Sequence, residues 1–192
     1  MTILKLVTSP DPLLKKISSK VEKIDDKTQE LMKNMLETMY QEQGIGLAAV
    51  QIGVLKKIIV IDVDYKLEIN HEEKGSKYKI LNQNPRFLVN AEIINQSTQN
   101  SNYKEGCLSF PGASSDVSRP KEVEVRYLDL NGKQHTEKMS GLLATCVQHE
   151  VDHTNGITFV DHISKLKRDM ILKKMAKRKK DSTRSNKDFN VL

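Results

Sequence analysis

Two histidines one helical turn apart, at the end of an apolar segment, restrict the folds open to this chain. His149 and His153 are four residues apart, so an α-helix would place both side chains on one face. The preceding residues 141–147 are almost wholly apolar, which predicts that this helix is buried. Ionisable side chains on a buried helix are costly unless they are paired or bind a metal. We therefore predict a fold that encloses this helix, and a metal ion held by the two histidines.

Glu150 completes a His-Glu-x-x-His pattern, which is typical of zinc hydrolases. Its position beside His149 lets it accept a proton from a water molecule on the metal. The metal needs a third protein ligand, and the sequence after His153 contains few suitable residues. Phe159 stands where an extended form of the pattern has a histidine, and no glutamate follows Glu150. Asp161 and His162, in the connection after the helix, stay open as ligands.

The two cysteines, Cys107 and Cys146, have no Cys-x-x-Cys spacing, and a disulfide scaffold is not expected. Cys146 is separated from His153 by roughly 10.5 Å of helical rise, too far for both to bind one ion. We interpret Cys146 as an apolar wall beside the metal. Cys107 lies in the Gly- and Pro-containing segment 103–112, which can approach the helix from elsewhere. It is the best third ligand, and a Cys-His-His set leaves a fourth position for water, as catalytic sites do.

Three segments together resemble the signature motifs of the peptide deformylase family, in the same order. They are Gly44-Ile45-Gly46-Leu47-Ala48-Ala49-Val50-Gln51, Glu105-Gly106-Cys107-Leu108-Ser109 and Gln148-His149-Glu150-Val151-Asp152-His153. The similarity covers most of the chain, and three motifs in order with compatible spacing are highly specific. The resemblance implies a cytoplasmic, metal-dependent hydrolase that removes the N-formyl group from the formyl-methionine of nascent peptides.

The resemblance also implies roles for individual residues. The metal ligands would be Cys107, His149 and His153, and Glu150 would be the general base and acid. The metal would be Fe(II), with zinc, nickel or cobalt as substitutes, because softness and geometry permit several metals at such a site.

On the substrate side, Gln51 and the backbone N–H of Leu108 would donate hydrogen bonds to the developing oxyanion. Ile45 and Gly46 would offer an extended edge to which a peptide adds as a strand. The residues expected to contact substrate are Ile45, Gly46, Leu142 and Cys146. The chain departs from the family pattern at Thr154, where a leucine is usual, and at 113–115, where a basic residue near the substrate is common.

The sequence predicts an α+β fold, with antiparallel sheets around the buried helix and a further helix at the C-terminus. Residues 65–84 are polar and lack periodicity, and we interpret them as a long loop or mobile hairpin in which His71 is solvated. Strands are expected at 57–63, 87–97, 122–130 and 133–139, the last two joined by a hairpin turn at Asn131-Gly132. Helices are expected at 12–16, 26–43, 141–154 and 164–179, the second with a C-cap at Gly44.

Basic residues concentrate at the C-terminus. Residues 164–192 hold eleven Lys or Arg and three Asp, a net charge of +8, whereas the whole chain carries +6. We expect a catalytic domain at 1–165 and a basic helix and tail of the same unit at 166–192. The apolar stripe of this helix is Leu166, Met170, Ile171 and Met175. The basic face is either solvated or docks on ribosomal RNA near the peptide exit. No apolar run is long enough to span a membrane.

Two other functions are compatible with parts of the pattern. A zinc endopeptidase would use His149, His153 and Asp161, and would keep its metal when Cys107 is replaced. A basic nucleic-acid-binding protein would hold a structural metal, and would not need Glu150.

Overall fold

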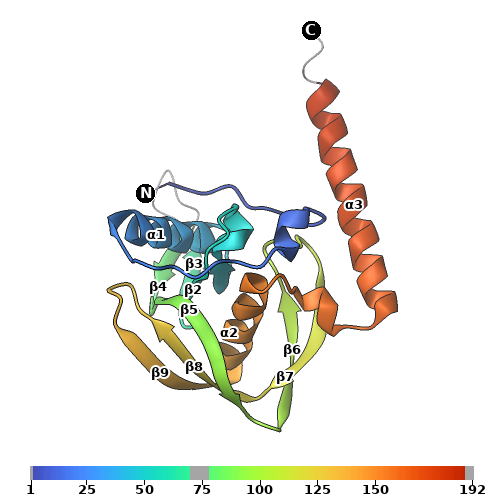
Figure 1. Cartoon of the computed structure of the whole chain (residues 1–192). Coiled ribbons are helices and arrows are strands. Elements are labelled where there is room, and N and C mark those ends of the chain that lie inside the picture. Colours follow the sequence, from blue (N-terminus) through green and yellow to red (C-terminus); the bar gives the residue numbers. More distant parts are fainter. Residues whose placement is uncertain (1, 70–77, 189–192) are drawn as a thin grey trace.

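The protein has an α+β fold, as the sequence predicted, and the computed structural model describes residues 2–69 and 78–188 (Figure 1). Its helices are α1 (Asp26–Gln41), α2 (Gly141–Thr154) and α3 (Lys165–Asp188). Single 3-10 turns are η1 (Pro12–Lys15), η2 (Ala49–Ile52) and η3 (Phe159–His162).

The named strands of the described residues pair antiparallel. The main sheet has the order β1 (Gly46–Ala48), β2 (Ile58–Ile61), β5 (Arg86–Gln96), β8 (Glu122–Leu128) and β9 (Gln134–Ser140). Two hairpins lie beside it: β3 (Lys66–Ile69) with β4 (Tyr78–Leu81), and β6 (Asn100–Gly106) with β7 (Ser114–Pro120). The predicted turn at Asn131-Gly132 joins β8 to β9, and Gly132 adopts the left-handed backbone (φ +81°) that such a turn requires.

Helix α2 lies at the centre of the molecule, between the main sheet and the β6–β7 hairpin (Figure 1). One face of α2 packs against the sheet in an apolar cluster that includes Ala144, Val147 and Val151. The opposite face of the sheet packs against α1 through Met32, Met35 and Met39. The prediction of a buried central helix is therefore confirmed.

The end of α1 differs from the prediction. The helix stops at Gln41, and the left-handed residue is Gln43 (φ +57°), so the cap does not lie at Gly44. The N–H of Gly44 still closes the turn by donating to the carbonyl of Met39 at 2.8 Å. Gly44 has another use: a Cβ there would lie 2.8 Å from the Cδ1 atom of Leu108. Its missing side chain lets the loop after α1 approach the loop that carries Cys107.

Two other regions refine the prediction. The segment 65–84 forms the β3–β4 hairpin at its ends, while residues 70–77, with His71, lie outside the described residues. The apolar stripe of α3 is used only in part. Met175 is buried in a cluster with Phe110 and Phe159, whereas Leu166 and Met170 are exposed. Among the described residues, no helix is both long and apolar enough to cross a membrane.

Candidate metal centre and active site

Three side chains with metal-binding atoms converge on one point. Cys107 follows β6, and His149 and His153 lie on α2. One donor atom from each lies within 4.8 Å of the others, and the Cys107 Sγ to His153 Nε2 distance is 3.2 Å. Two ligands at about 2.1 and 2.3 Å from a tetrahedral metal would be roughly 3.6 Å apart. The geometry therefore fits a single ion held by one thiolate and two imidazoles.

His149 is oriented by a buried acid. Its Nδ1 lies 2.8 Å from Oε2 of Glu105, which is itself held by Arg119 through bonds of 2.6 and 3.1 Å. Burial alone would raise the pKa of Glu105, but the hydrogen bonds from His149 and Arg119 outweigh it and lower the pKa to about 2. An ionised carboxylate only accepts, so Nδ1 of His149 carries the proton and Nε2 is left for a metal.

This buried chain of charges continues to the surface. Arg119 donates to Oδ2 of Asp152 at 2.8 Å, and the same oxygen lies 2.7 Å from Nε2 of His162. Asp161 is bonded instead to Lys15 and to Thr158. Asp161 and His162, the alternative third ligands, are therefore engaged elsewhere and do not join the cluster of Cys107 and the two histidines.

His153 is fully buried, and burial lowers its pKa well below the ordinary value. It is therefore neutral at pH 7, the form in which imidazole binds metals. Its Nδ1 has no hydrogen-bond partner among the described residues.

Glu150 is buried beside the donor cluster, with 3% of its surface exposed. Its Oε2 atom has no hydrogen-bond partner in the part of the chain that the structure describes. Burial raises its pKa to about 7, and this effect outweighs the attraction of His149. A carboxyl group with this pKa exchanges a proton readily near neutral pH.

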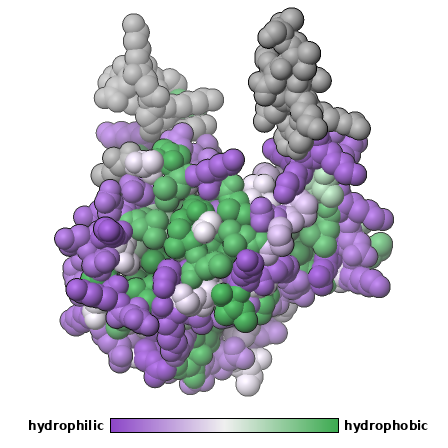
Figure 2. Space-filling model, turned by 45° about the horizontal axis from the view of Figure 1, so that its top comes forward, coloured by the Kyte–Doolittle hydropathy of each residue, from purple (hydrophilic) through white to green (hydrophobic). Residues whose placement is uncertain are grey.

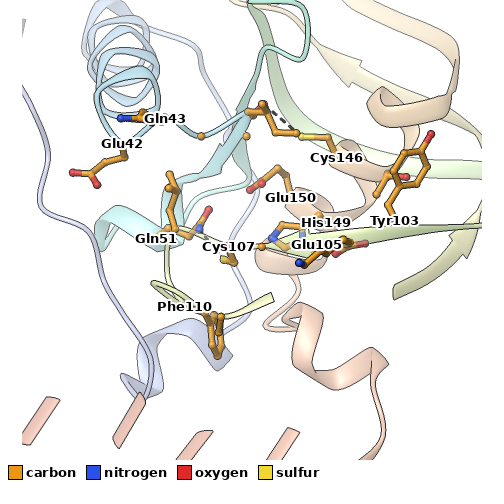
Figure 3. A pocket seen from close by; sticks show the side chains of 18 of the residues that line it. Glu42, Gln43, Gln51, Tyr103, Glu105, Cys107, Phe110, Cys146, His149 and Glu150 are labelled. Carbon is orange, nitrogen blue, oxygen red and sulfur yellow. Dashed lines mark hydrogen bonds and ion pairs between the residues drawn. The ribbon is translucent and has the colours of Figure 1, made fainter. Parts of the chain in front are cut away.

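Gln51 has a fixed orientation. Its Oε1 accepts the N–H of Ala48 at 2.7 Å, so its Nε2 is turned toward Ser109 Oγ (3.2 Å) and Cys107 Sγ (3.5 Å). In Figure 3 its side chain points toward Cys107, His149 and Glu150. An amide donor is thus aimed at the space beside the metal-binding atoms.

Cys107, His149, Glu150 and Gln51 line a cavity of about 530 Å³. The residues that the sequence assigned to substrate contact all line it: Ile45, Gly46, Leu142 and Cys146, together with Leu108. Gly46 is packed closely, because a Cβ there would lie 2.6 Å from Oε1 of Glu150 and 2.8 Å from Sγ of Cys146. Only glycine lets β1 approach the carboxylate this closely.

A model of the polypeptide deformylase family matches residues 3–169. The chain belongs to this family. It is 44% identical over 186 residues to a peptide deformylase of Novosphingobium aromaticivorans, covering 94% of this chain and 99% of that protein. It is 47% identical over 177 residues to a peptide deformylase of Pelagibacter ubique, covering 92% of this chain and 95% of that protein.

Solved structures agree. The crystal structure of the peptide deformylase from Ehrlichia chaffeensis matches with a TM-score of 0.80 at 43% identity, over 93% of this chain and 97% of that one. The same enzyme in complex with actinonin also matches with a TM-score of 0.80. The chain is therefore a metal-dependent deformylase, which removes the N-formyl group from the N-terminal formyl-methionine of newly made polypeptides.

The sequence interpretation missed four residues of this site. Glu105 and Arg119 hold His149, Ser109 contacts Gln51, and Thr145 lines the cavity. Glu105 and Ser109 flank Cys107 in one motif, and Thr145 precedes His149 by one helical turn, so spacing pointed to these three. Arg119 carries no such signal, because only the pairing of β6 with β7 brings it near Glu105.

Proposed function

We propose that Cys107, His149 and His153 hold the catalytic metal of this deformylase. The observation that carries the proposal is the convergence of their donor atoms within 4.8 Å, and two of them, Cys107 and His149, line one cavity with Glu150. A divalent cation supplies Lewis acidity, which polarises a carbonyl group and lowers the pKa of a water molecule. Fe(II) is the proposed metal, and a thiolate with two imidazoles also suits zinc, nickel or cobalt.

Glu150 is the proposed general base and acid. Its carboxylate lines the cavity, and it accepts a proton from the attacking water and then returns it to the nitrogen that leaves the formyl group. The raised pKa, about 7, supports both halves of this role, because the carboxyl group gains and loses its proton at similar cost near neutral pH.

Gln51 and the backbone N–H of Leu108 are the proposed donors to the oxyanion that forms on the formyl group. The bond from Ala48 to Oε1 of Gln51 supports this, since it keeps the amide nitrogen turned toward the cavity. Such donors act without rearrangement during the reaction, and removing one typically costs about 10²–10³ in rate.

The peptide is proposed to bind along β1. This strand is at the edge of the main sheet, and Ile45 and Gly46 line the cavity. An extended peptide that adds to such an edge gains backbone hydrogen bonds. Leu142 and Cys146, on the cavity face of α2, would contact the first side chain.

A ribosome contact is proposed for the basic helix α3. Lys174 donates to the carbonyl of Gly112 at 2.6 Å, so this lysine links α3 to the loop that follows Cys107. Lys173, Lys177 and Lys180 are exposed, and Figure 2 shows α3, at its right, covered largely by hydrophilic side chains. We also propose a cytoplasmic location, a catalytic domain at 1–165 and a basic extension at 166–192.

The ribosome proposal is tested by replacing Lys173, Lys177 and Lys180 with glutamine. Ribosome affinity should fall, and its logarithmic salt dependence should weaken by about one for each lysine that contacts a phosphate. Glutamine at Lys27, Lys33 and Lys133 provides a control with the same change in charge. Equal affinities of the two triple variants would refute the contact.

Formate release from formyl-Met-Ala under anaerobic conditions, with metal analysis of the same sample, tests the proposed active site. Glu150→Gln should keep its metal and lose about 10²–10⁴ in rate, the usual value of general acid–base catalysis. Full activity of this variant would rule out the role given to Glu150. Cleavage of internal peptide bonds in place of formate release would favour an endopeptidase.

A further inference from the structure

Tyr65 holds a wall of the active-site cavity from outside it. Its hydroxyl donates to the backbone carbonyl of Gly44 at 3.0 Å. Gly44 belongs to the segment 42–46, between the end of α1 and the start of β1, and all five residues of this segment line the cavity. Gly44 also packs against Leu108, since a Cβ at Gly44 would lie 2.8 Å from Leu108 Cδ1. The Tyr65 hydroxyl is therefore bonded to a segment that faces the proposed substrate and oxyanion sites.

Tyr65 is itself fixed in place. Its backbone N–H donates to Oδ1 of Asp62 at 3.2 Å, and its ring meets the ring of Tyr40 edge-on, with centroids 4.8 Å apart. The Tyr40 hydroxyl donates to Oδ2 of the buried Asp62 at 2.6 Å, and the N–H of Asn84, beyond β4, donates to the same oxygen at 2.9 Å. Both ends of the β3–β4 hairpin are thus tied to Asp62. A tyrosine held in this way bonds to Gly44 at little further cost in side-chain entropy.

The bond from Tyr65 fixes the direction of the peptide unit between Gly44 and Ile45. This unit is planar and trans, so its C=O and its N–H point to opposite sides. Because the carbonyl faces Tyr65, the N–H of Ile45 faces away from the hairpin, and no backbone hydrogen bond among the described residues uses it. The carbonyl of Ile45 accepts the N–H of Asp62 at 3.0 Å. The edge therefore offers a backbone donor to a strand that is added there.

We propose that Tyr65 is a positioning residue for peptide binding, which keeps the N–H of Ile45 directed toward the bound peptide. This inference rests on the proposed binding of the peptide along β1. Without the Tyr65 hydroxyl, the Gly44–Ile45 unit is free to rotate, and ordering it when the peptide binds lowers the affinity. Tyr65 is not among the residues that line the cavity, so its loss should leave the chemical step unchanged.

The test compares formate release from formyl-Met-Ala-Ser and from formyl-methioninamide, which ends at the first residue. In the wild type, kcat/KM should be about tenfold or more higher for the tripeptide, because only the tripeptide extends along the edge. Tyr65→Phe keeps the ring and removes the donor. It should lower this ratio by about three- to tenfold through a higher KM for the tripeptide, while kcat and metal content stay unchanged.

Tyr127→Phe is the matched control. Tyr127 also donates its hydroxyl, to Glu137 at 3.1 Å, but from β8, outside the cavity lining. Its ratio and its KM should equal those of the wild type. A wild-type ratio in Tyr65→Phe would overturn the proposal. An equal fall of kcat for both substrates would also overturn it, because that result indicates a general loss of structure. A wild type that does not prefer the tripeptide would contradict the proposed peptide edge, and this inference with it.

Discussion

The buried acid that holds His149 gives the sharpest prediction about this fold. Glu105→Gln removes the negative charge but keeps the size of the side chain. Arg119, whose side chain is 5% exposed, then keeps Asp152 as its remaining carboxylate partner. Breaking a buried ion pair by removing one partner typically costs about 3–5 kcal/mol. We expect about 3 kcal/mol, the lower end of that range, because Asp152 still compensates part of the charge.

The metal site should respond as well. Glutamine accepts a weaker hydrogen bond from His149 than a carboxylate does, and such supporting changes typically cost about 10–100-fold in metal affinity. Urea unfolding of the metal-free protein measures the free energy of unfolding, and titration with a competing chelator measures metal affinity.

Glu137→Gln is the matched control for this experiment. Glu137 and Arg86 form an ion pair with a similar distance of 2.7 Å, but their side chains are 35% and 30% exposed. Exposed pairs contribute about 0.2–1 kcal/mol, so this variant should lose less than about 1 kcal/mol and keep its metal affinity. Equal losses of stability in the two variants would refute the reasoning that burial gives the Glu105 pair its weight.

Three further predictions concern Gly46, the apolar stripe of α3, and the pH dependence of stability. Gly46→Ala would push a methyl group against Glu150 and Cys146. The rate of formate release should fall about 10²-fold, while the circular dichroism spectrum is unchanged. A wild-type rate would contradict the close packing. Met175→Ala should cost about 2–5 kcal/mol in urea unfolding, whereas Met170→Ala, at 64% exposure, should cost no more than about 0.5 kcal/mol. Folding lowers the pKa of Glu105 from 4.5 to about 2, so the ionised carboxylate stabilises the fold above about pH 4.5. This contribution is lost as the pH falls toward 2. In Glu105→Gln the free energy of unfolding should therefore depend less on pH between 4.5 and 2 than it does in the wild type. The same pH dependence in both proteins would contradict this prediction.

The central part of the fold could be predicted because two physical constraints coincide at α2. An apolar run followed by His149, Glu150 and His153 requires burial and compensation of charge together, and the α+β fold around a buried helix satisfies both. The strands β2, β5, β8 and β9 also follow from their alternating or apolar patterns. Their observed bounds lie within three residues of the predicted ones.

The β6–β7 hairpin could not be predicted in the same way. Asn100–Gly106 is polar, and one of its seven residues is buried, so its sequence lacks the alternation of a half-buried strand. The hairpin nevertheless brings Glu105 and Cys107 to α2. The exposure of Leu166 and Met170 on α3 was also missed, because the stripe does not reveal which of its residues meet the cluster around Phe110.

Metal content of two cysteine variants tests the central claim most directly. Cys107 and Cys146 both line the cavity, but only the first of these two cysteines lies in the cluster of donor atoms with His149 and His153. Protein purified anaerobically should contain about one divalent metal ion per chain in the wild type and in Cys146→Ala, and almost none in Cys107→Ala. Retention of metal by Cys107→Ala would contradict the account, and would return Asp161 or His162 to consideration as the third ligand.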